Sequence, residues 1–346
     1  MTPTSDTTAG SPGGPAPAAA GAAAAPAAPA RRRSTDLIVK SNLLLVFLAL
    51  CVVATLLAPE FLTTRNVANL LQQSALTGIV AIGMTLVILT AGIDLSVGSV
   101  AAFGGMTVAL LLDHDMNILL AMGISIAAGA AFGAAMGGLS AYLSLPSFMT
   151  TLAGLTAIRG LTYLLTDGEP AGGGSIPEGF QLLGGGFIGY VPIVGLIFVA
   201  VTVLAALLLR GTTFGEYVYA VGSNKEAARL SGLPVRAVIT AVFAISGALS
   251  AFAGVLLTSR LTIGQPTAFE GMELDAIAAV VLGGTNLFGG RGGVFGTFVA
   301  VLLLSVLRNL CNLLGLGSFF QMVVTGLILV AALILNRVIE QRGARA

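Results

Sequence analysis

Few polar residues of this chain could do chemistry, and the most conspicuous group lies between two long apolar runs. It reads Gly-Ser-Asn-Lys-Glu-Ala-Ala-Arg-Leu-Ser-Gly from Gly222 to Gly232. Ser223 and Glu226 have the spacing of an S-x-x-E capping box, which starts a helix, and Gly232 followed by Pro234 ends it after about two turns, or roughly 12 Å. A short charged helix between membrane spans suits binding by a partner protein.

A second polar group interrupts the apolar sequence between Ala91 and Ser99, where the chain reads Ala-Gly-Ile-Asp-Leu-Ser-Val-Gly-Ser. The glycines permit a tight reversal, and Asp94 and Ser96 can cap the helix that follows and complement its dipole. The alternative is that this junction lines the inner mouth of a pore, because a charged side chain near the membrane usually has a function.

Catalytic and metal-binding patterns are absent from the sequence. The only lysines are Lys40 and Lys225, and neither follows a glycine, so the phosphate-loop pattern G-x-x-x-x-G-K-[ST] fails. The glycine-rich stretch 283–296 is better explained as a close-packed turn between two spans. His114 is the single histidine, and no H-E-x-x-H occurs. We expect no enzyme activity, no metal and no cofactor, with any ATP bound by a partner.

The composition indicates what must position these residues. Of 346 residues, 56% are hydrophobic and 9% charged, and the mean hydropathy is +0.99, far from the composition of soluble domains. Backbone groups inside a bilayer must pair internally, so long apolar runs predict helices. We expect an all-α polytopic membrane bundle of about ten transmembrane helices, at 42–58, 67–90, 95–112, 118–142, 148–166, 187–209, 237–257, 272–288, 294–312 and 318–336.

The predicted organisation has three parts. Residues 1–36 form a disordered cytoplasmic tail, 37–340 form the transmembrane domain with a cytoplasmic loop at 211–236, and 341–346 form a second tail. The region 65–112 could instead hold a broken helix and a re-entrant piece. The chain could also consist of two halves of opposite orientation, because spans two to five and seven to ten are offset by five helices, an odd number.

Charge asymmetry predicts the orientation in the cell membrane. The segments on one side carry Arg31, Arg32, Arg33, Lys40, Arg210, Lys225, Arg229, Arg236, Arg291, Arg337, Arg342 and Arg345. The other side has Arg65 and Arg260 with most of the loop acids. Basic loops stay inside, so both termini are expected in the cytoplasm.

These motifs resemble those of a known family. Gly92-Ile-Asp-Leu-Ser-Val-Gly-Ser99 is similar to the signature of ribose-type sugar permeases, the membrane subunits of ABC importers, and Glu226-Ala-Ala with Gly232 resembles the loop that docks their ATPase. Further matches begin at Thr150, Asp275 and Phe288, so the likeness covers about 43–336. The compact end of the loop departs from other importers, where more residues separate the glycine from the proline.

The resemblance implies a permease that imports a monosaccharide such as ribose, xylose or galactose. Its implied partners are a cytoplasmic ABC ATPase, an extracytoplasmic sugar-binding protein, a second permease chain in a homodimer, and the lipid bilayer; nucleic acid is not among them. Nucleosides, inositol or an autoinducer are alternative substrates within the family. An ion-coupled secondary transporter is a distant alternative, because no acid falls at the centre of a span.

Site residues are assigned on this basis. We expect the ATPase to be coupled through Ser223, Asn224, Glu226, Ala227, Ala228 and Gly232. A weakly polar translocation path is expected from Thr85, Asp94, Ser96, Thr156, Asn286 and Asn309, each of which could equally form a helix–helix hydrogen bond. Receptor docking is expected at Arg65, Asp167, Glu169 and Arg260. The stripe Gly129, Gly133 and Gly137 suits internal packing or a dimer face.

Overall fold

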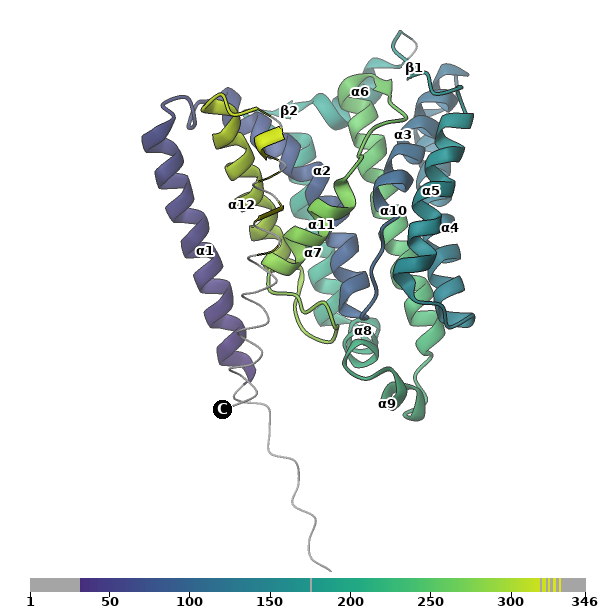
Figure 1. The fold of residues 1–346 in the computed structure, drawn as a ribbon. Coiled ribbons are helices and arrows are strands. Elements are labelled where there is room, and N and C mark those ends of the chain that lie inside the picture. Colours follow the sequence, from purple (N-terminus) through teal and green to yellow (C-terminus); the bar gives the residue numbers. More distant parts are fainter. Residues whose placement is uncertain are drawn as a thin grey trace, which may run out of the picture.

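The computed structural model describes residues 32–317 except 175, together with 319–321, 323, 326, 327 and 330. Its elements follow one another as α1 (Arg32–Leu57), α2 (Thr64–Leu89), α3 (Val97–Asp113), α4 (Ile118–Tyr142), α5 (Ser147–Leu164), β1 (Ala171–Gly172), α6 (Glu178–Gly185), β2 (Phe187–Ile188), β3 (Val191–Pro192), α7 (Ile193–Gly211), α8 (Thr213–Ser223), α9 (Lys225–Leu230), α10 (Val235–Leu261), β4 (Ile263–Gly264), α11 (Met272–Leu282) and α12 (Val294–Leu313). The strands form two short antiparallel pairs, β1 with β4 and β2 with β3. The all-α bundle predicted from the sequence is confirmed (Figure 1).

Fewer apolar spans are present in the described residues than the ten expected. Five helices, α2, α4, α7, α10 and α12, are long and apolar enough to cross a membrane, and the apolar part of α1 and helix α3 are shorter. The span predicted at 272–288 is wrong, because α11 has only 11 residues and ends at Leu282. Such a helix is about 16 Å long, about half of a bilayer core. Most of the span predicted at 318–336 lies outside the described residues.

The amino-terminal boundary also differs from the prediction. Helix α1 begins at Arg32, so residues 32–36, which we placed in the tail, are helical. The arginines that marked the end of the tail are good helix formers and do not interrupt the helix. Residues 1–31 and the second tail at 341–346 lie outside the described residues.

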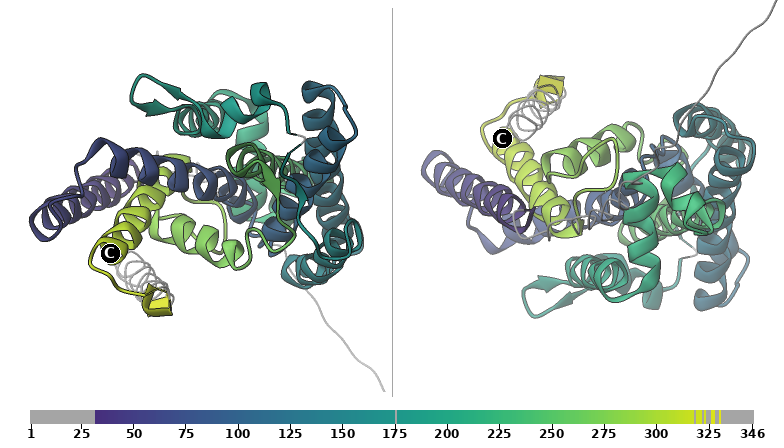
Figure 2. Two further views of the ribbon diagram at one scale, coloured as in Figure 1. Left: turned by 90° about the horizontal axis from the view of Figure 1, so that it is seen from above. Right: turned by 90° about the horizontal axis from the view of Figure 1, so that it is seen from below.

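Helix α10 lies at the centre of the bundle and packs against α2, α3 and α4 (Figure 2). The stripe on α4 faces it closely: a Cβ at Gly133 would lie 2.1 Å from the carbonyl oxygen of Phe243, and one at Gly129 would lie 2.4 Å from the Cβ of Ala251. A Cβ at Gly137 would similarly meet Phe243. The small residues therefore serve internal packing, and their faces are not free for a dimer contact.

Two long helices are each followed by a non-helical segment and a short helix. Segment 90–96 separates α2 from α3, and segment 262–271 separates α10 from α11 (Figure 1). Each has a left-handed residue other than glycine in its first two positions, Ala91 at φ 60° and Thr262 at φ 57°. Since α10 starts at the end of the molecule where α2 stops, the two units run in opposite directions. The inverted halves left open by the sequence would produce this pattern.

The starts of the two short helices lie against each other. A Cβ at Gly98, in the first turn of α3, would lie 2.5 Å from the carbonyl oxygen of Phe269 and 2.7 Å from Oε2 of Glu273. Glycine is required at this contact because any side chain would push the two segments apart. The region 65–112 is divided by segment 90–96 into α2 and α3, close to the two spans predicted at 67–90 and 95–112.

Candidate functional site

The loop 211–236 folds into two short helices joined by Asn224. This residue is extended, with φ −160° and ψ 102°, and it ends α8 and begins α9. Its Oδ1 accepts a hydrogen bond of 2.9 Å from the backbone N–H of Ala227, which is the bond of an N-cap. The capping box predicted for Ser223 and Glu226 is therefore wrong by one residue. Ser223 is the last residue of α8, and asparagine caps a helix as well as serine does.

The other end of α9 stops as the sequence predicted. Gly232 has φ 81°, its N–H donates to the carbonyl of Arg229 at 3.0 Å, and the N–H of Leu233 donates to the carbonyl of Ala228 at 3.1 Å. These are the two hydrogen bonds of a Schellman motif, which needs a left-handed residue at this position. Pro234 then starts α10 directly, so α9 continues into the central helix of the bundle with almost no linker.

Helix α9 presents most of its surface to solvent. Ala228 is buried, whereas Glu226, Ala227 and Arg229 are exposed, and Leu230 is 76% exposed. The guanidinium of Arg229 donates to Glu226, with Nε to Oε2 at 3.1 Å, and this hydrogen bond lowers the pKa of the Glu226 carboxyl. The pair contributes little to stability at an exposed position. It fixes the orientation of two charges on an otherwise accessible surface.

The end of α8 is packed against α2 with no room for a side chain. A Cβ at Gly222 would lie 1.8 Å from the carbonyl oxygen of Leu89, in the last turn of α2, and 2.7 Å from the backbone nitrogen of Gly290. The N–H of Gly290 donates to the same Leu89 carbonyl at 3.0 Å. The glycine-rich stretch 283–296 is thus a close-packed turn, and it joins α8 to the end of α2.

Asp94 and Ser96 meet in a buried hydrogen-bonded group. Oδ1 of Asp94 accepts from the N–H of Ser96 at 3.0 Å and from its hydroxyl at 2.6 Å, and Oδ2 accepts from the hydroxyl of Ser246 at 3.1 Å. The Asp94 side chain is 1% exposed, and the described residues show no ion pair to it. Its three donors replace water, which allows a carboxylate at this depth.

Segment 90–96 is also held on its other side by α5. The hydroxyl of Ser147 accepts from the N–H of Ile93 at 3.1 Å, and the hydroxyl of Thr151 donates to the carbonyl of Ile93 at 3.2 Å. Ile93 therefore has both backbone groups satisfied by side chains of α5, where no helix supplies their partners. Ser147, Thr151 and Ser246 were not among the predicted site residues, and their one sequence signal is that they are small polar residues near or within apolar runs.

Segment 262–271 is held by a charged residue of the same helix α5. One nitrogen of Arg159 donates to the carbonyls of Pro266 and Ala268, at 2.6 and 2.9 Å. The short helix α11 is tied to α12 by an ion pair between Asp275 and Arg308. Arg159 is thus paired with backbone carbonyls, and Asp275 with Arg308.

The other residues predicted for a translocation path do not gather at one place. Thr85 is buried and shares a 2.8 Å hydrogen bond with Thr297, which joins α2 to α12. Asn309 exchanges two hydrogen bonds with Asn66, at 2.9 and 2.7 Å. Both are helix–helix hydrogen bonds, the alternative that the sequence left open. Thr156 is exposed on α5 and donates to its own helix, and Asn286 lies in the turn before α12.

The residues predicted for receptor docking share one end of the molecule. Arg65 begins α2, Asp167 and Glu169 follow α5, and Arg260 closes α10. These positions lie at the end opposite to α9 (Figure 1). Their grouping at one end agrees with the predicted role in receptor docking.

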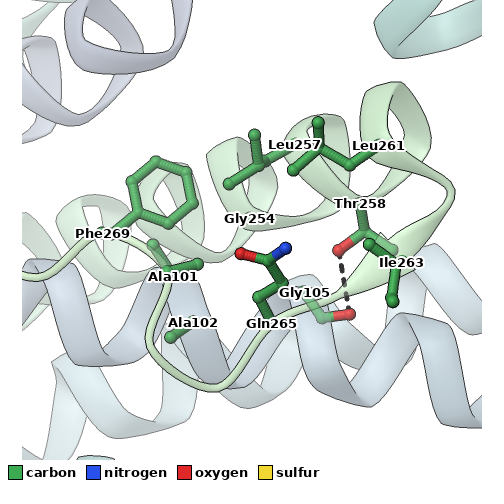
Figure 3. Close-up of a pocket in the computed structure, with 11 residues that line it drawn as sticks. Ala101, Ala102, Gly105, Gly254, Leu257, Thr258, Leu261, Ile263, Gln265 and Phe269 are labelled. Carbon is green, nitrogen blue, oxygen red and sulfur yellow. Dashed lines mark hydrogen bonds between the residues drawn. The ribbon is translucent and has the colours of Figure 1, made fainter. Parts of the chain in front are cut away.

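A pocket beside segment 262–271 has almost no free space. Figure 3 shows this pocket between α3, α10 and segment 262–271. The hydroxyl of Thr258 donates to the carbonyl of Gly105 at 3.1 Å, and Gln265 also lines the pocket. Its free volume for a water-sized molecule is about 0 Å³. A larger groove of about 330 Å³ between α4 and α5 is almost wholly apolar. Neither space suits a sugar.

Comparison with known proteins agrees with the geometry. Residues 66–333 match the family described as the permease component of the branched-chain amino acid transport system. The chain is 44% identical to the ribose import permease protein of Bacillus subtilis (strain 168) over 288 residues, which covers 83% of this chain and 89% of the relative.

Two further relatives extend the comparison. The ribose import permease protein of Escherichia coli (strain K12) is 40% identical over 306 residues, covering 86% of this chain and 94% of the relative. The L-arabinose ABC transporter permease protein of Azospirillum brasilense is 37% identical over 315 residues, covering 89% and 90%. No solved structure matches the chain.

Proposed function

Since the chain belongs to the permease family of the branched-chain amino acid transport system and is a sugar-type ABC permease of the membrane, we propose that it imports a monosaccharide with energy from a separate ATPase. The ATPase would bind ATP, and this chain would bind no cofactor. A binding protein on the outer side would deliver the sugar, and a second copy of the chain would complete the pathway.

The observation that carries this proposal is the construction of α9. The helix is closed at both ends by Asn224 and Gly232, is exposed on most of its surface, and continues into the central helix α10. A helix of six residues is too short to be stable by itself in water. Its rigid attachment to α8 and α10 suits it to pass a displacement from a partner into the bundle.

The position of the same helix supports the proposed orientation. The start of α1 and helix α9 lie at one end of the molecule, and Arg65, Asp167, Glu169 and Arg260 lie at the other (Figure 1). Placing α9 at the cytoplasmic face puts the basic loops inside and the receptor-docking residues outside. The start of α1 would then be cytoplasmic, and the charge asymmetry of the sequence predicts the same side for both termini.

The substrate class rests on the relatives. Relatives are named for ribose and for arabinose, which are neutral and rich in hydroxyls. Nucleosides, inositol and an autoinducer have similar chemistry, so competition with radiolabelled ribose uptake separates them.

The coupling role is tested by exchanging the charge on α9. The importer is purified through a tag on this chain, reconstituted in vesicles, and assayed for ATP hydrolysis and ribose uptake. Glu226→Lys should reduce uptake by about tenfold or more, because it replaces the ion pair with two like charges on the surface of α9 proposed to bind the ATPase. Glu216→Lys makes the same change on the exposed face of α8 and should leave uptake within about twofold of the unaltered importer. Equal uptake by both variants would remove α9 from the coupling mechanism.

A further inference from the structure

The turn between α11 and α12 lies beside α8 and is closed by its own hydrogen bonds. The N–H of Asn286 donates to the carbonyl of Arg291 at 3.0 Å, and the N–H of Gly289 donates to the carbonyl of Asn286 at 3.0 Å. The side chain of Asn286 accepts from the N–H of Phe288 at 2.8 Å. These bonds fix the backbone on both sides of Phe288.

The turn between α11 and α12 is also packed closely against α8. Gly289 and Gly290 have φ of 83° and 71°, and Cβ atoms on them would lie 2.8 Å from the Gly222 oxygen and 2.5 Å from the Ser223 hydroxyl. The hydroxyl of Tyr219 donates to the carbonyl of Gly292 at 3.0 Å. The turn and α8 therefore move together, and α9 is joined to α8 by the single residue Asn224.

Phe288 has no packing role in this unit. Its side chain is 79% exposed, although the backbone that carries it is held in place. Leu230, at the end of α9, is 76% exposed. Both residues lie outside the spans, at the same end of the molecule. A large apolar side chain presented on a rigid turn loses little conformational entropy on binding, which suits it to anchor a partner.

We propose that Phe288 and α9 with Leu230 form one composite docking surface for the ATPase subunit. This inference rests on the proposed function, since it assigns a second contact to the same partner. Leu230 and Phe288 supply apolar anchors, and the Glu226–Arg229 pair lies between the capped ends of α9 as the polar part of the surface. The surface is continuous because the turn contacts Ser223, which immediately precedes the cap of α9.

Photo-crosslinking tests which molecule covers Phe288. p-Benzoylphenylalanine is placed at position 288, at 230 and, as a control, at 295, in the full chain expressed in its native membrane. Phe295 is 49% exposed in the first turn of α12 and is matched in residue type. Positions 288 and 230 should crosslink to one polypeptide, identified as an ABC ATPase by mass spectrometry, and position 295 should not.

The remaining outcomes decide separately on the inference and on the function. Adducts with lipid alone, or with a second copy of this chain, at 288 while 230 reaches the ATPase would overturn the composite surface and leave the coupling role of α9 intact. Failure of both positions to reach an ATPase would overturn the coupling role as well. A binding measurement adds to this: Phe288→Ala should retain about tenfold less ATPase during purification, and Phe295→Ala should retain the normal amount. Normal retention by Phe288→Ala would also overturn the inference.

Discussion

Ser246 donates a hydrogen bond of 3.1 Å to Asp94, although 152 residues separate them along the chain. Ser246 lies on α10, which begins at Val235, three residues after the left-handed Gly232 that ends α9. Asp94 lies in segment 90–96 between α2 and α3. The bond therefore joins the helix that continues α9 to a buried carboxylate in segment 90–96. Displacement of α10 must either move Asp94 or break this contact.

The first prediction concerns this bond. Ser246→Ala removes one donor and leaves a carboxylate oxygen unsatisfied in a buried site, which should cost about 1–3 kcal/mol of unfolding free energy. Thermal unfolding in nanodiscs measures it. The matched control is Ser125→Ala, because the hydroxyl of Ser125 is equally buried but donates to Ala121 in its own helix. An equal loss of unfolding free energy in both variants would show that the hydrogen bond to Asp94 stabilises the protein no more than a bond within a helix does.

The second prediction concerns the junction between α8 and α2. Gly222→Ala places a methyl group 1.8 Å from the Leu89 oxygen, so the two helices must separate. Such overpacking typically costs about 1–3 kcal/mol. Gly138→Ala provides the control, since a Cβ there meets nothing within 4 Å and alanine favours a helix. Unfolding temperatures should fall for the first variant and hold or rise for the second.

The third prediction concerns the stop of α9. Gly232→Ala should destabilise the left-handed turn by about 1–2 kcal/mol, whereas Gly232→Asn should cost less because asparagine tolerates this conformation. Hydrogen–deuterium exchange of the peptide covering 224–234 reports the loss directly. Faster exchange in the alanine variant, with the asparagine variant between it and the unaltered protein, is the expected order. Identical exchange in all three would contradict it.

The fourth prediction concerns the charge that holds segment 262–271. Arg159→Ala leaves the carbonyls of Pro266 and Ala268 without their donor, so this segment should exchange hydrogen faster and uptake should fall by about tenfold. Arg159→Lys should recover part of the uptake, since an ammonium can donate to both oxygens but lacks the planar fork. Arg210→Ala, at the exposed end of α7, serves as the control. Unchanged exchange in Arg159→Ala would sink the assignment.

The fifth prediction tests whether Thr85 serves a helix–helix hydrogen bond or lies on the translocation path. Thr85→Val and Thr297→Val should each lower the unfolding free energy by about 1 kcal/mol, and the double variant should lose less than their sum because one bond is shared. Ribose uptake per folded molecule should stay unchanged in all three. A change in the ratio of ribose to arabinose uptake would instead place Thr85 on the path.

The sequence predicted what local patterns encode. Gly232 before Pro234 predicted the end of α9, and the apolar runs predicted α2, α4, α10 and α12 close to their observed bounds. The span predicted at 187–209 began too early, because α7 starts at Ile193 and the preceding residues form the β2–β3 hairpin. The start of α9 was misplaced by one residue because Ser223 and Asn224 are equally good caps. Tertiary contacts decided between them, since Ser223 is held in α8 beside Gly290.

Other features depend on contacts that a pattern does not carry. The residues 272–288 have the composition of a full span, yet α11 ends at Leu282, because the chain must turn at the glycines that meet α12. The same composition suits a helix and a close-packed turn. The partners of Asp94 were unpredictable for a similar reason, since Ser246 is one of several serines inside an apolar run.

Helix α5 holds both interruptions, through Ile93 on one side and through Pro266 and Ala268 on the other. A single rigid element that grips two chain breaks removes their independence: neither can rearrange alone without first losing bonds to the shared helix. The molecule should accordingly switch between two global arrangements and not pass through states in which one half has changed and the other has not.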